Sequence, residues 1–383
     1  MIWAGLRGRS RTAAHPSGNR ARPEHKQPQR PLTARYEPPK TARRCLPMRD
    51  PELVLGRRCA SALAAVALDD GQGPLLTYEY ARPRRHVDDV AWFRFSAPDR
   101  EAEPLPPRPG VRRFDAAVVR IDKSREATTL ALVETSACVR IGGRLFMYGG
   151  NDEGIRAWDG RDGFQTVDAG GHGRVLLREV QDEALPEHGG HDHRYLVPWR
   201  RLRRSRPGLS ERDWIEYPGC FSIGGDDPGS ALLAKTLDSH PPPKGKTLDF
   251  GCGPGFLCAA LRERGLRSPI VALDRDALAL VALRENVPDV EAVLGSTPAD
   301  ALRHGLGGFS FIISNPPLHD GRVRDRAMWH ALVETAPSLL APEGELRFVV
   351  QRQVKAERLL SQTFKRFSAL LTTSRYIVWS ATK

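Results

Sequence analysis

A hydrophobic segment at residues 309–314 ends in a loop whose residue types are suited to holding an amino group. The loop begins Asn315-Pro316-Pro317. Proline has no backbone N–H, so this pair cannot join a sheet interior or continue a helix, and the loop is rigid and poor in donors. The Asn315 side-chain oxygen and the Pro316 carbonyl can accept the two hydrogens of an amine and turn its lone pair toward an electrophile. Asn315, Pro316 and Pro317 are therefore the candidate catalytic residues.

A glycine-rich loop at residues 251–255 is the second candidate site. Residues 247–250 predict a strand, 256–264 predict a helix, and 270–273 predict a strand that Asp274 follows. Glycines let the backbone approach a ligand closely, and the first N–H groups of a helix are free to donate. An acid about 20 residues beyond such a loop can accept the ribose hydroxyl hydrogens of a nucleotide. This order predicts half of a nucleotide-binding α/β sheet, with a glycine-rich turn of an unrelated α/β domain as the alternative.

The two loops are expected to face one crevice. Residues 309–314 form a continuous apolar run, which is typical of a strand buried in a parallel sheet. In such sheets ligands bind outside the carboxyl ends of the strands. We therefore expect residues 251–255 and Asn315 on neighbouring strands, at the same edge.

The sequence DFGCGPG, which contains Asp249, resembles motif I of class I S-adenosylmethionine-dependent methyltransferases. Its G-x-G-x-G spacing differs from the G-x-G-x-x-G of nicotinamide-binding folds. The resemblance implies S-adenosylmethionine as the cofactor, with Asp249 near the methionine amino group and Asp274 on the ribose. The implied cofactor-binding residues are Asp249, Gly251, Gly253, Gly255, Asp274, Ser296 beside the adenine, and Asn315.

The sequence SNPPLHDG, which contains Asn315, resembles the ribosomal RNA guanine-N2 methyltransferases of the RsmC/RlmG type, whose pattern is Asn-Pro-Pro-aromatic-His-x-Gly. The resemblance implies methyl transfer to the exocyclic N2 amine of a guanine, with ribosomal RNA or a ribosomal subunit as the partner. Leu318 departs from the pattern, since the usual phenylalanine packs on the flipped base and a leucine covers a base face without stacking. His319 fits either a loop-anchoring hydrogen bond or a substrate contact, and we do not assign it as a general base.

The segment at residues 217–237 also resembles this family, in the stretch just before its catalytic sheet. The matching residues are Pro218, Gly219, Phe221, Ser222, Asp227, Gly229 and Ser230. The resemblance places the segment over the cofactor and makes Phe221 an apolar wall, with an ordinary core position as the alternative. The candidate substrate-binding residues are thus Phe221, Leu318 and His319.

An internal repeat relates the two halves of the chain. The segments beginning at Phe114 and Phe309 share a hydrophobic strand, a loop, a helix with the sequence ALVET, a glycine turn and a strand. The first copy lacks both the Asn-Pro-Pro loop and the glycine motif. We therefore expect an α/β fold with two Rossmann-like class I methyltransferase domains in tandem, the N-terminal one degenerate and serving RNA binding or support.

Charge is concentrated at the N-terminus. The net charge is +12, and residues 1–50 contain 12 Lys and Arg residues against three acidic ones. Such a Pro/Arg-rich segment cannot bury a core and predicts disorder. It fits an RNA-tethering arm, a targeting segment, or sequence translated upstream of a start at Met48.

Four segments are predicted. They are a basic leader at 1–47, a degenerate domain at 48–187, a basic linker at 188–212 and a catalytic domain at 213–383. In and beside the linker, clustered arginines between Trp199 and Trp214 suggest phosphate binding and base stacking. His188, His191 and His193 lack partners at a metal-ligand spacing, so we expect no metal site.

The six cysteines include no C-x-x-C pair, and no apolar run is long enough for a membrane helix. We expect a cytoplasmic protein without membrane contact, acting as a monomer. Two other functions remain open. One is methylation of a protein glutamine N5 or an adenine N6, since such enzymes also use Asn-Pro-Pro. The other is a cofactor-binding RNA scaffold that has lost turnover.

Overall fold

The computed structural model divides the chain into two units, Met1–Met48 and Arg49–Lys383. Structure is described for residues 51–65, 73–80, 86–97, 99–106, 111–182, 196, 198–203, 206, 208–316 and 323–383, without the side chains of 51–53 and 323–327. The predictions for the leader, for the three linker histidines and for Pro317, Leu318 and His319 therefore lie outside the described residues. The four domain boundaries stay predictions.

A seven-stranded sheet contains both predicted loops. Its strand order is β11-β10-β9-β12-β13-β15-β14, and only the pairings of β15 with β13 and β14 are antiparallel. Its strands are β9 (Thr247–Phe250), β10 (Ile270–Asp274), β11 (Glu291–Leu294), β12 (Phe309–Ser314), β13 (Leu340–Gln351), β14 (Arg366–Thr372) and β15 (Tyr376–Thr382). The strands predicted at 247–250 and 309–314 are confirmed.

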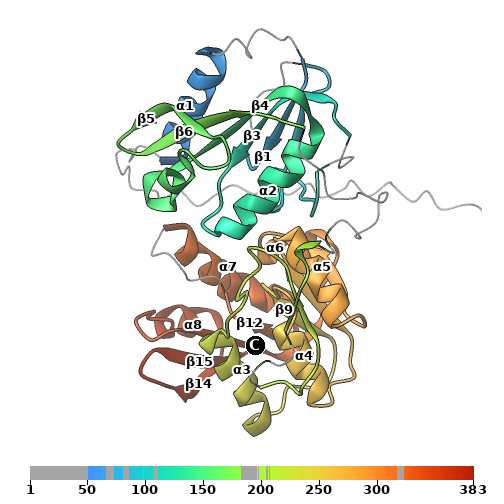
Figure 1. Cartoon of the computed structure of the whole chain (residues 1–383). Coiled ribbons are helices and arrows are strands. Elements are labelled where there is room, and N and C mark those ends of the chain that lie inside the picture. Colours follow the sequence, from blue (N-terminus) through green and yellow to red (C-terminus); the bar gives the residue numbers. More distant parts are fainter. Residues whose placement is uncertain are drawn as a thin grey trace, which may run out of the picture. The chain divides into compact units, whose positions relative to one another are not determined.

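Helices cover both faces of this sheet, as its continuous apolar strands require (Figure 1). The helices are α3 (Pro228–Ser239), α4 (Phe256–Glu263), α5 (Ala277–Asn286), α6 (Pro298–Arg303), α7 (Val323–Leu339) and α8 (Glu357–Thr363). Phe311 and Ile313 of β12 pack with α3, α4 and α5, whereas Ile312 packs with α6, α7 and α8. The period-two alternation of side chains along β12 thus separates two cores.

A second sheet of six strands has the order β2-β1-β3-β4-β6-β5. Its strands are β1 (Leu75–Tyr78), β2 (Val90–Trp92), β3 (Phe114–Arg120), β4 (Val139–Gly150), β5 (Gln165–Gly170) and β6 (Gly173–Glu179). With it lie α1 (Pro51–Ala65), α2 (Arg125–Cys138) and the short 3-10 helices η1 (Asn151–Glu153) and η2 (Ile155–Trp158). A separate two-stranded sheet joins β7 (Arg201–Arg203) to β8 (Trp214–Glu216).

The register confirms that the two sheets are copies of one design. In the six-stranded sheet β3 pairs with β4 through Phe114↔Val139 and then, after a register shift, Ala116↔Arg144. In the seven-stranded sheet β12 pairs with β13 through Phe309↔Leu340 and then, after the same kind of shift, Phe311↔Glu345. The order of the six strands matches that of the seven-stranded sheet without its edge strand β11.

The strand pairing also shows which residues of the first copy stand in place of the candidate site residues of the second copy. Tyr78 pairs with Val119 and Trp92, just as Phe250 pairs with Ser314 and Leu273. One residue further along each strand, three residues of the first copy therefore occupy the positions that Gly251, Asn315 and Asp274 occupy in the second copy. These three residues are Glu79, Arg120 and Phe93, respectively.

The two copies pair through equivalent loops. The backbones after β2 and β10 form an antiparallel bridge at Phe95 and Asp276. Ser96 N donates to the Arg275 carbonyl at 2.8 Å, and Ala277 N donates to the Arg94 carbonyl at 3.0 Å. Arg94 stands in its loop where Arg275 stands in the other, so the exchange of hydrogen bonds is reciprocal.

A buried ion pair lies within this contact between the two loops. Arg94 donates from Nε and Nη2 to the two carboxylate oxygens of Asp276, at 2.8 and 2.6 Å. Its Nη1 donates to the Pro218 carbonyl at 2.7 Å. The two side chains are 1% and 9% exposed, so each charge depends on the other for compensation.

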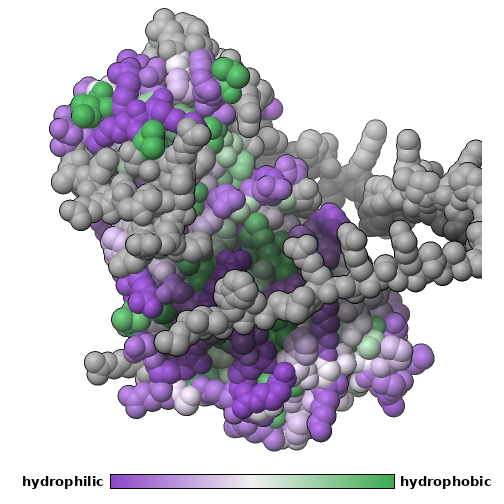
Figure 2. Space-filling view, turned by 90° about the vertical axis from the view of Figure 1, so that its right-hand side faces the viewer, coloured by the Kyte–Doolittle hydropathy of each residue, from purple (hydrophilic) through white to green (hydrophobic). Residues whose placement is uncertain are grey.

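Hydrophilic residues cover most of the coloured part of the face in Figure 2, with hydrophobic residues in smaller groups between them. No helix within the described ranges is long and apolar enough to cross a membrane. The described side chains include no cluster of His, Cys, Asp or Glu that could hold a metal ion.

Removing the positive charge of Arg94 should destabilise the protein strongly, because it leaves Asp276 buried and uncompensated. We expect Arg94→Met to lower the free energy of unfolding by about 3–5 kcal/mol in urea titrations. Arg94→Met combined with Asp276→Asn, which removes the orphaned charge and keeps a helix-capping side chain, should recover part of that loss. A double variant as unstable as the sum of the two single variants would contradict this account.

Candidate active site

The glycine loop follows β9 with a backbone that side chains disfavour. Gly251, Gly253 and Gly255 have φ values of 72°, 53° and 96°, in the left-handed region. A Cβ added to Gly255 would lie 2.5 Å from Leu283 of α5, so this residue must be glycine for packing as well as for conformation. A Cβ on Gly253 would meet Phe221 at 3.7 Å. The loop is thus shaped for close backbone approach, directly before α4.

Asp274 ends β10, the strand next to β9, and contacts this loop. Its Oδ2 accepts from Gly253 N at 2.7 Å, and its Oδ1 accepts from Asp276 N at 2.9 Å. Burial raises the pKa of its carboxyl to about 6, and the neighbouring Asp276 charge adds to the rise while the two N–H donors oppose it. A carboxylate beside a glycine loop, on adjacent parallel strands, is the arrangement that holds a nucleoside ribose.

Asp249 is buried beneath the loop. Its side chain is fully enclosed, and Oδ2 accepts from the Cys258 thiol of α4 at 3.1 Å. Oδ1 has no hydrogen-bond partner among the described residues, and burial raises the pKa of the carboxyl to about 7. The structure therefore shows Asp249 joining β9 to α4, and its predicted contact with a methionine amino group stays a prediction.

Ser296 lies just before α6, whose N-cap is Thr297. Its backbone N and hydroxyl both donate to Asp300 Oδ2, at 2.7 and 3.2 Å. It does not line the pocket that contains Gly251 and Asn315. Its predicted place beside an adenine stays a prediction.

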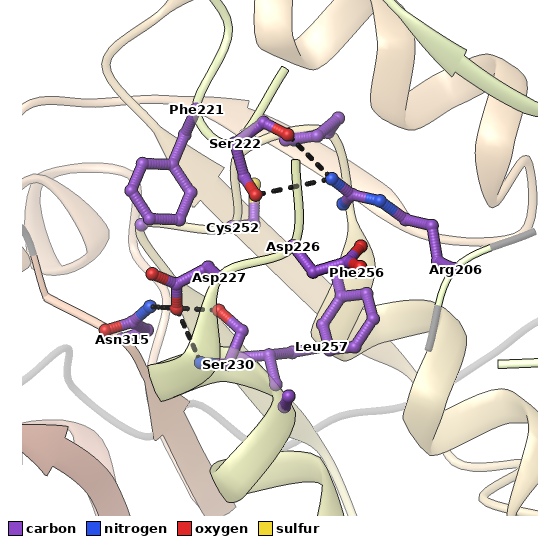
Figure 3. Close-up of a pocket in the computed structure, with 13 residues that line it drawn as sticks. Arg206, Phe221, Ser222, Asp226, Asp227, Ser230, Cys252, Phe256, Leu257 and Asn315 are labelled. Atoms are coloured by element: carbon purple, nitrogen blue, oxygen red, sulfur yellow. Dashed lines mark hydrogen bonds between the residues drawn. The ribbon is translucent and has the colours of Figure 1, made fainter. Parts of the chain in front are cut away.

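Asn315 directly follows β12, the other neighbour of β9, and its amide is held in one orientation (Figure 3). The Nδ2 group donates to Asp227 Oδ2 at 2.6 Å and to Ser230 Oγ at 2.9 Å. An amide nitrogen has two hydrogens, and both are used. The carboxylate of Asp227 can only accept, so it determines which end of the amide is nitrogen. The Oδ1 atom accepts no hydrogen bond from the part of the chain that the structure describes.

The helix that orients Asn315 is specified locally. Asp227 is the N-cap of α3, and its Oδ2 also accepts from Ser230 N at 2.6 Å. Pro228 occupies the first helical position, where its missing N–H costs nothing. The capping turn thus presents the Asp227 carboxylate and the Ser230 hydroxyl side by side to Asn315. Pro316, the next residue, is buried.

One pocket brings the two predicted loops together, as expected (Figure 3). Phe221 is 41% exposed and lines this pocket, so the alternative that it is a core residue is wrong. The pocket is lined by Arg206, Phe221, Ser222, Asp226, Asp227, Ser230, Ala231, Gly251, Cys252, Pro254, Phe256, Leu257 and Asn315.

Arg206 is the residue of the basic linker that lines this pocket. Arg206 is 4% exposed, donates to the Ser222 and Gly225 carbonyls at 2.8 Å and pairs with Glu216 at 3.1 Å. Trp214 is completely buried, so the prediction that it stacks on bases is wrong.

The other arginines that the structure describes in this cluster are also paired. Arg200 pairs with Glu285, Arg201 with Glu126 and Arg203 with Asp226. They connect the linker to neighbouring elements, so they do not form a free phosphate-binding cluster. Arg204 lies outside the described residues.

Sequence reasoning missed the polar partners of this site. Asp227 and Ser230 were matched to a family pattern without a role, although Asp-Pro-Gly-Ser is a recognisable helix start. That this helix start lies beside Asn315, 85 residues later, follows only from the sheet. Arg94 belongs to the other half of the chain, and no local signal relates it to Asp276.

The described residues fit a nucleotide-bearing cofactor and an adjoining acceptor. The glycine loop is open to close approach, Asp274 can accept ribose hydroxyl hydrogens, and Asn315 presents an acceptor oxygen at the same edge. The chain matches the family model described as "Methyltransferase small domain" over residues 211–380.

Curated relatives extend the match beyond that region. A ribosomal RNA small subunit methyltransferase C from Pseudomonas paraeruginosa is 34% identical over 274 residues, covering 66% of this chain and 77% of the relative. A protein of the same name from Pseudomonas aeruginosa is 31% identical over 307 residues, covering 77% of this chain and 87% of the relative.

A solved structure has the same fold. It is described as the T. thermophilus 16S rRNA N2 G1207 methyltransferase (RsmC) in complex with AdoMet and guanosine. The match has a TM-score of 0.70 at 24% identity and covers 88% of this chain and 92% of that chain. The fold is therefore two tandem class I methyltransferase units with a degenerate first one, and the chain belongs to the ribosomal RNA small subunit methyltransferase C family.

Proposed function

We propose that the chain transfers a methyl group from S-adenosylmethionine to the exocyclic N2 amine of a guanine in small-subunit ribosomal RNA. The observation that carries this proposal is the orientation of Asn315. Its amide oxygen is left as an acceptor at the carboxyl edge of the sheet, and Asn315 lines the pocket that Gly251 also lines. The names of the curated relatives support ribosomal RNA as the substrate.

The cofactor would be held by the glycine loop and Asp274. When bound, S-adenosylmethionine supplies an electrophilic methyl group on a sulfonium sulfur. Asp274 would accept ribose hydroxyl hydrogens, and the backbone at Gly251 and Gly253 would allow the close approach that a side chain prevents. Phe221, which lies across from this loop, would form an apolar wall.

The acceptor amine would be turned by two oxygens. An aromatic amine is planar and weakly nucleophilic, so its lone pair must be directed at the methyl carbon. Asn315 Oδ1 and the Pro316 carbonyl would each accept one N–H, which fixes that direction and stabilises the positive charge that develops on nitrogen. The new N–C bond forms as the S–C bond breaks, and the nitrogen then loses a proton to water. No strong base is required.

The predicted partner and compartment follow from this reaction. Ribosomal RNA or a subunit is the partner, and we propose a monomer in the cytoplasm, since the chain already pairs two copies of the fold through the loops at Phe95 and Asp276. The first copy would bind RNA or support the second. The competing explanations are methylation of a protein glutamine N5 or an adenine N6, and a cofactor-binding RNA scaffold that has lost turnover.

A methyl-transfer assay tests the reaction class. Radiolabelled S-adenosylmethionine is supplied with undermethylated small subunits, with deproteinised 16S RNA and with ribosomal protein. We expect label in guanine N2 of the RNA. Label in protein would indicate the glutamine enzyme, label in adenine would indicate N6 methylation, and cofactor binding without label would indicate the scaffold.

Asn315→Ala should separate chemistry from cofactor binding. Without the positioned acceptor, we expect kcat to fall by about 10²–10³-fold while the affinity for S-adenosylhomocysteine, measured by calorimetry, changes little. Asp274→Ala is the matched comparison and should weaken S-adenosylhomocysteine binding first. Loss of cofactor binding in Asn315→Ala would show that the two roles are wrongly assigned.

Asp227→Ser tests whether the carboxylate orients Asn315. Serine is a good N-cap, so α3 should remain capped, while the acceptor that defines the amide orientation is lost. We expect kcat to fall with a nearly unchanged melting temperature. Combined with Asn315→Ala it should cause little further loss of kcat, because both variants disable one unit. Multiplicative losses would indicate independent roles.

Cofactor binding should weaken in acid through Asp274. The pKa of this carboxyl is raised to about 6 in the free protein, so below pH 6 it is protonated and must lose that proton to accept ribose hydroxyl hydrogens. We expect the Kd for S-adenosylhomocysteine to be constant above pH 7 and to rise by about tenfold per pH unit well below 6. Asp274→Asn should bind weakly with a flat profile. Asp249→Asn should keep the wild-type profile, and a flat profile there would assign the titration to Asp249.

A further inference from the structure

A groove lies on the other side of the helix turn that orients Asn315. It is lined by Pro228, Ala231, Leu232, Lys235, Thr373, Ser374, Arg375 and Tyr376. Ala231 also lines the active-site pocket, and Pro228 follows Asp227, so the two depressions share one wall. Figure 1 shows α3 beside the hairpin of β14 and β15 that forms the other side of the groove.

The composition of the groove suits a nucleic acid strand. None of its lining residues is acidic, two are cations and three carry a hydroxyl group. The Arg375 guanidinium lies 5.7 Å from the centroid of the partly exposed Tyr376 ring. Cations bind phosphates and an aromatic face stacks on a base or packs on a ribose, with little dependence on sequence.

The cations here are unpaired, in contrast to the linker arginines. Lys235 and Arg375 are exposed and form no ion pair with any residue that the structure describes, and the same holds for Arg352 and Lys355. Arg352 N donates to the Arg375 carbonyl at 2.8 Å, which joins the two basic segments. Exposed cations without carboxylate partners remain available for phosphates.

The sheet places these residues in line with the active site. β13 is parallel to β12, so Arg352 leaves the sheet at the same edge as Asn315. Tyr376 pairs with Gln351, so the turn before β15 lies at that edge as well. Along the edge, the glycine loop lies on one side of Asn315, while Arg352 and Arg375 lie on the other, and Lys235 of α3 lines the groove together with Arg375.

We propose that this groove binds the RNA strand that flanks the target guanine. Lys235, Arg352 and Arg375 hold phosphates, and Tyr376 packs against a neighbouring base or ribose. The inference rests on the proposed function, because it identifies where the substrate of that reaction continues beyond the reacting base. The partner is single-stranded RNA, since its bases are free to leave a stack and lie on an aromatic ring.

The test uses the full chain and 16S RNA transcribed in vitro. Lys235→Gln/Arg375→Gln removes two phosphate contacts, and Lys365→Gln/Arg267→Gln is the matched control. Lys365 and Arg267 are also exposed and form no ion pair among the described residues, but they precede β14 and β10 at the opposite edge of the sheet. Melting temperatures and S-adenosylhomocysteine affinity should equal those of the wild type in both double variants.

The double variant Lys235→Gln/Arg375→Gln, the groove variant, should bind the RNA more weakly and with less dependence on salt. Each phosphate contact contributes about 0.7 to the slope of log K against log salt for a single strand, so the slope should shrink by about 1.4. The KM for RNA should rise while kcat at saturating RNA stays near the wild-type value. Tyr376→Leu keeps an apolar side chain and should weaken binding without changing the slope.

The outcomes distinguish the two proposals. If the wild type methylates the RNA and the groove variant matches the control variant in KM and slope, the groove proposal is wrong and the proposed function stands. If the groove variant fails only on assembled subunits and binds free RNA normally, the groove contacts a protein and the proposal is equally wrong. If the wild type methylates neither RNA nor subunits, the proposed function fails and the groove proposal fails with it.

Discussion

The buried pair of Arg94 and Asp276 is the constraint on which the active half depends. A bidentate arginine buried to this extent is tolerated only where every polar neighbour is in place. Asp276 caps α5 and its backbone N–H donates to Asp274, while Arg94 also holds the Pro218 carbonyl. One side chain of the first copy therefore fixes both the acid of the cofactor site and the segment that leads to Phe221. This gives the degenerate half a physical role in the site without any chemistry of its own.

The two copies of the fold differ at three positions that correspond to the candidate site residues. Where the second copy has Gly251, Asp274 and Asn315, the first has Glu79, Phe93 and Arg120. The Glu79 carboxylate accepts from the N–H groups of Arg94 and Phe95 at 2.7 and 3.0 Å, so it binds the pairing loop instead of leaving room for a cofactor. Arg120 pairs with Glu153 at 2.8 Å. Positions that could hold ligands in one copy stabilise the structure in the other.

Sequence reasoning recovered what is encoded locally or repeated along the chain. The strands at 247–250 and 309–314 and the glycine turn follow from runs of residues a few positions apart, and the tandem fold follows from the ALVET repeat. It could not recover contacts made at long range. The pairing of Arg94 with Asp276, of Asn315 with Asp227 and of the linker arginines with distant acids depends on how strands are ordered. For the linker arginines this led to a wrong prediction, because the composition of the cluster suggests a phosphate site but its arginines are paired with acidic residues.

The orientation of the Asn315 amide depends both on local sequence and on long-range packing. An asparagine at a strand end can offer either its oxygen or its NH2 group, and only an acceptor-only neighbour decides between them. Asp227 provides that neighbour because it caps α3, and α3 is brought to the edge because its apolar face packs on the sheet with Leu233 and Ala234. The burial of α3 thus determines the orientation of the Asn315 amide, and that orientation determines whether the site can hold a donor group or an acceptor group of a substrate. An amine with two hydrogens to give matches it, and a carbonyl does not.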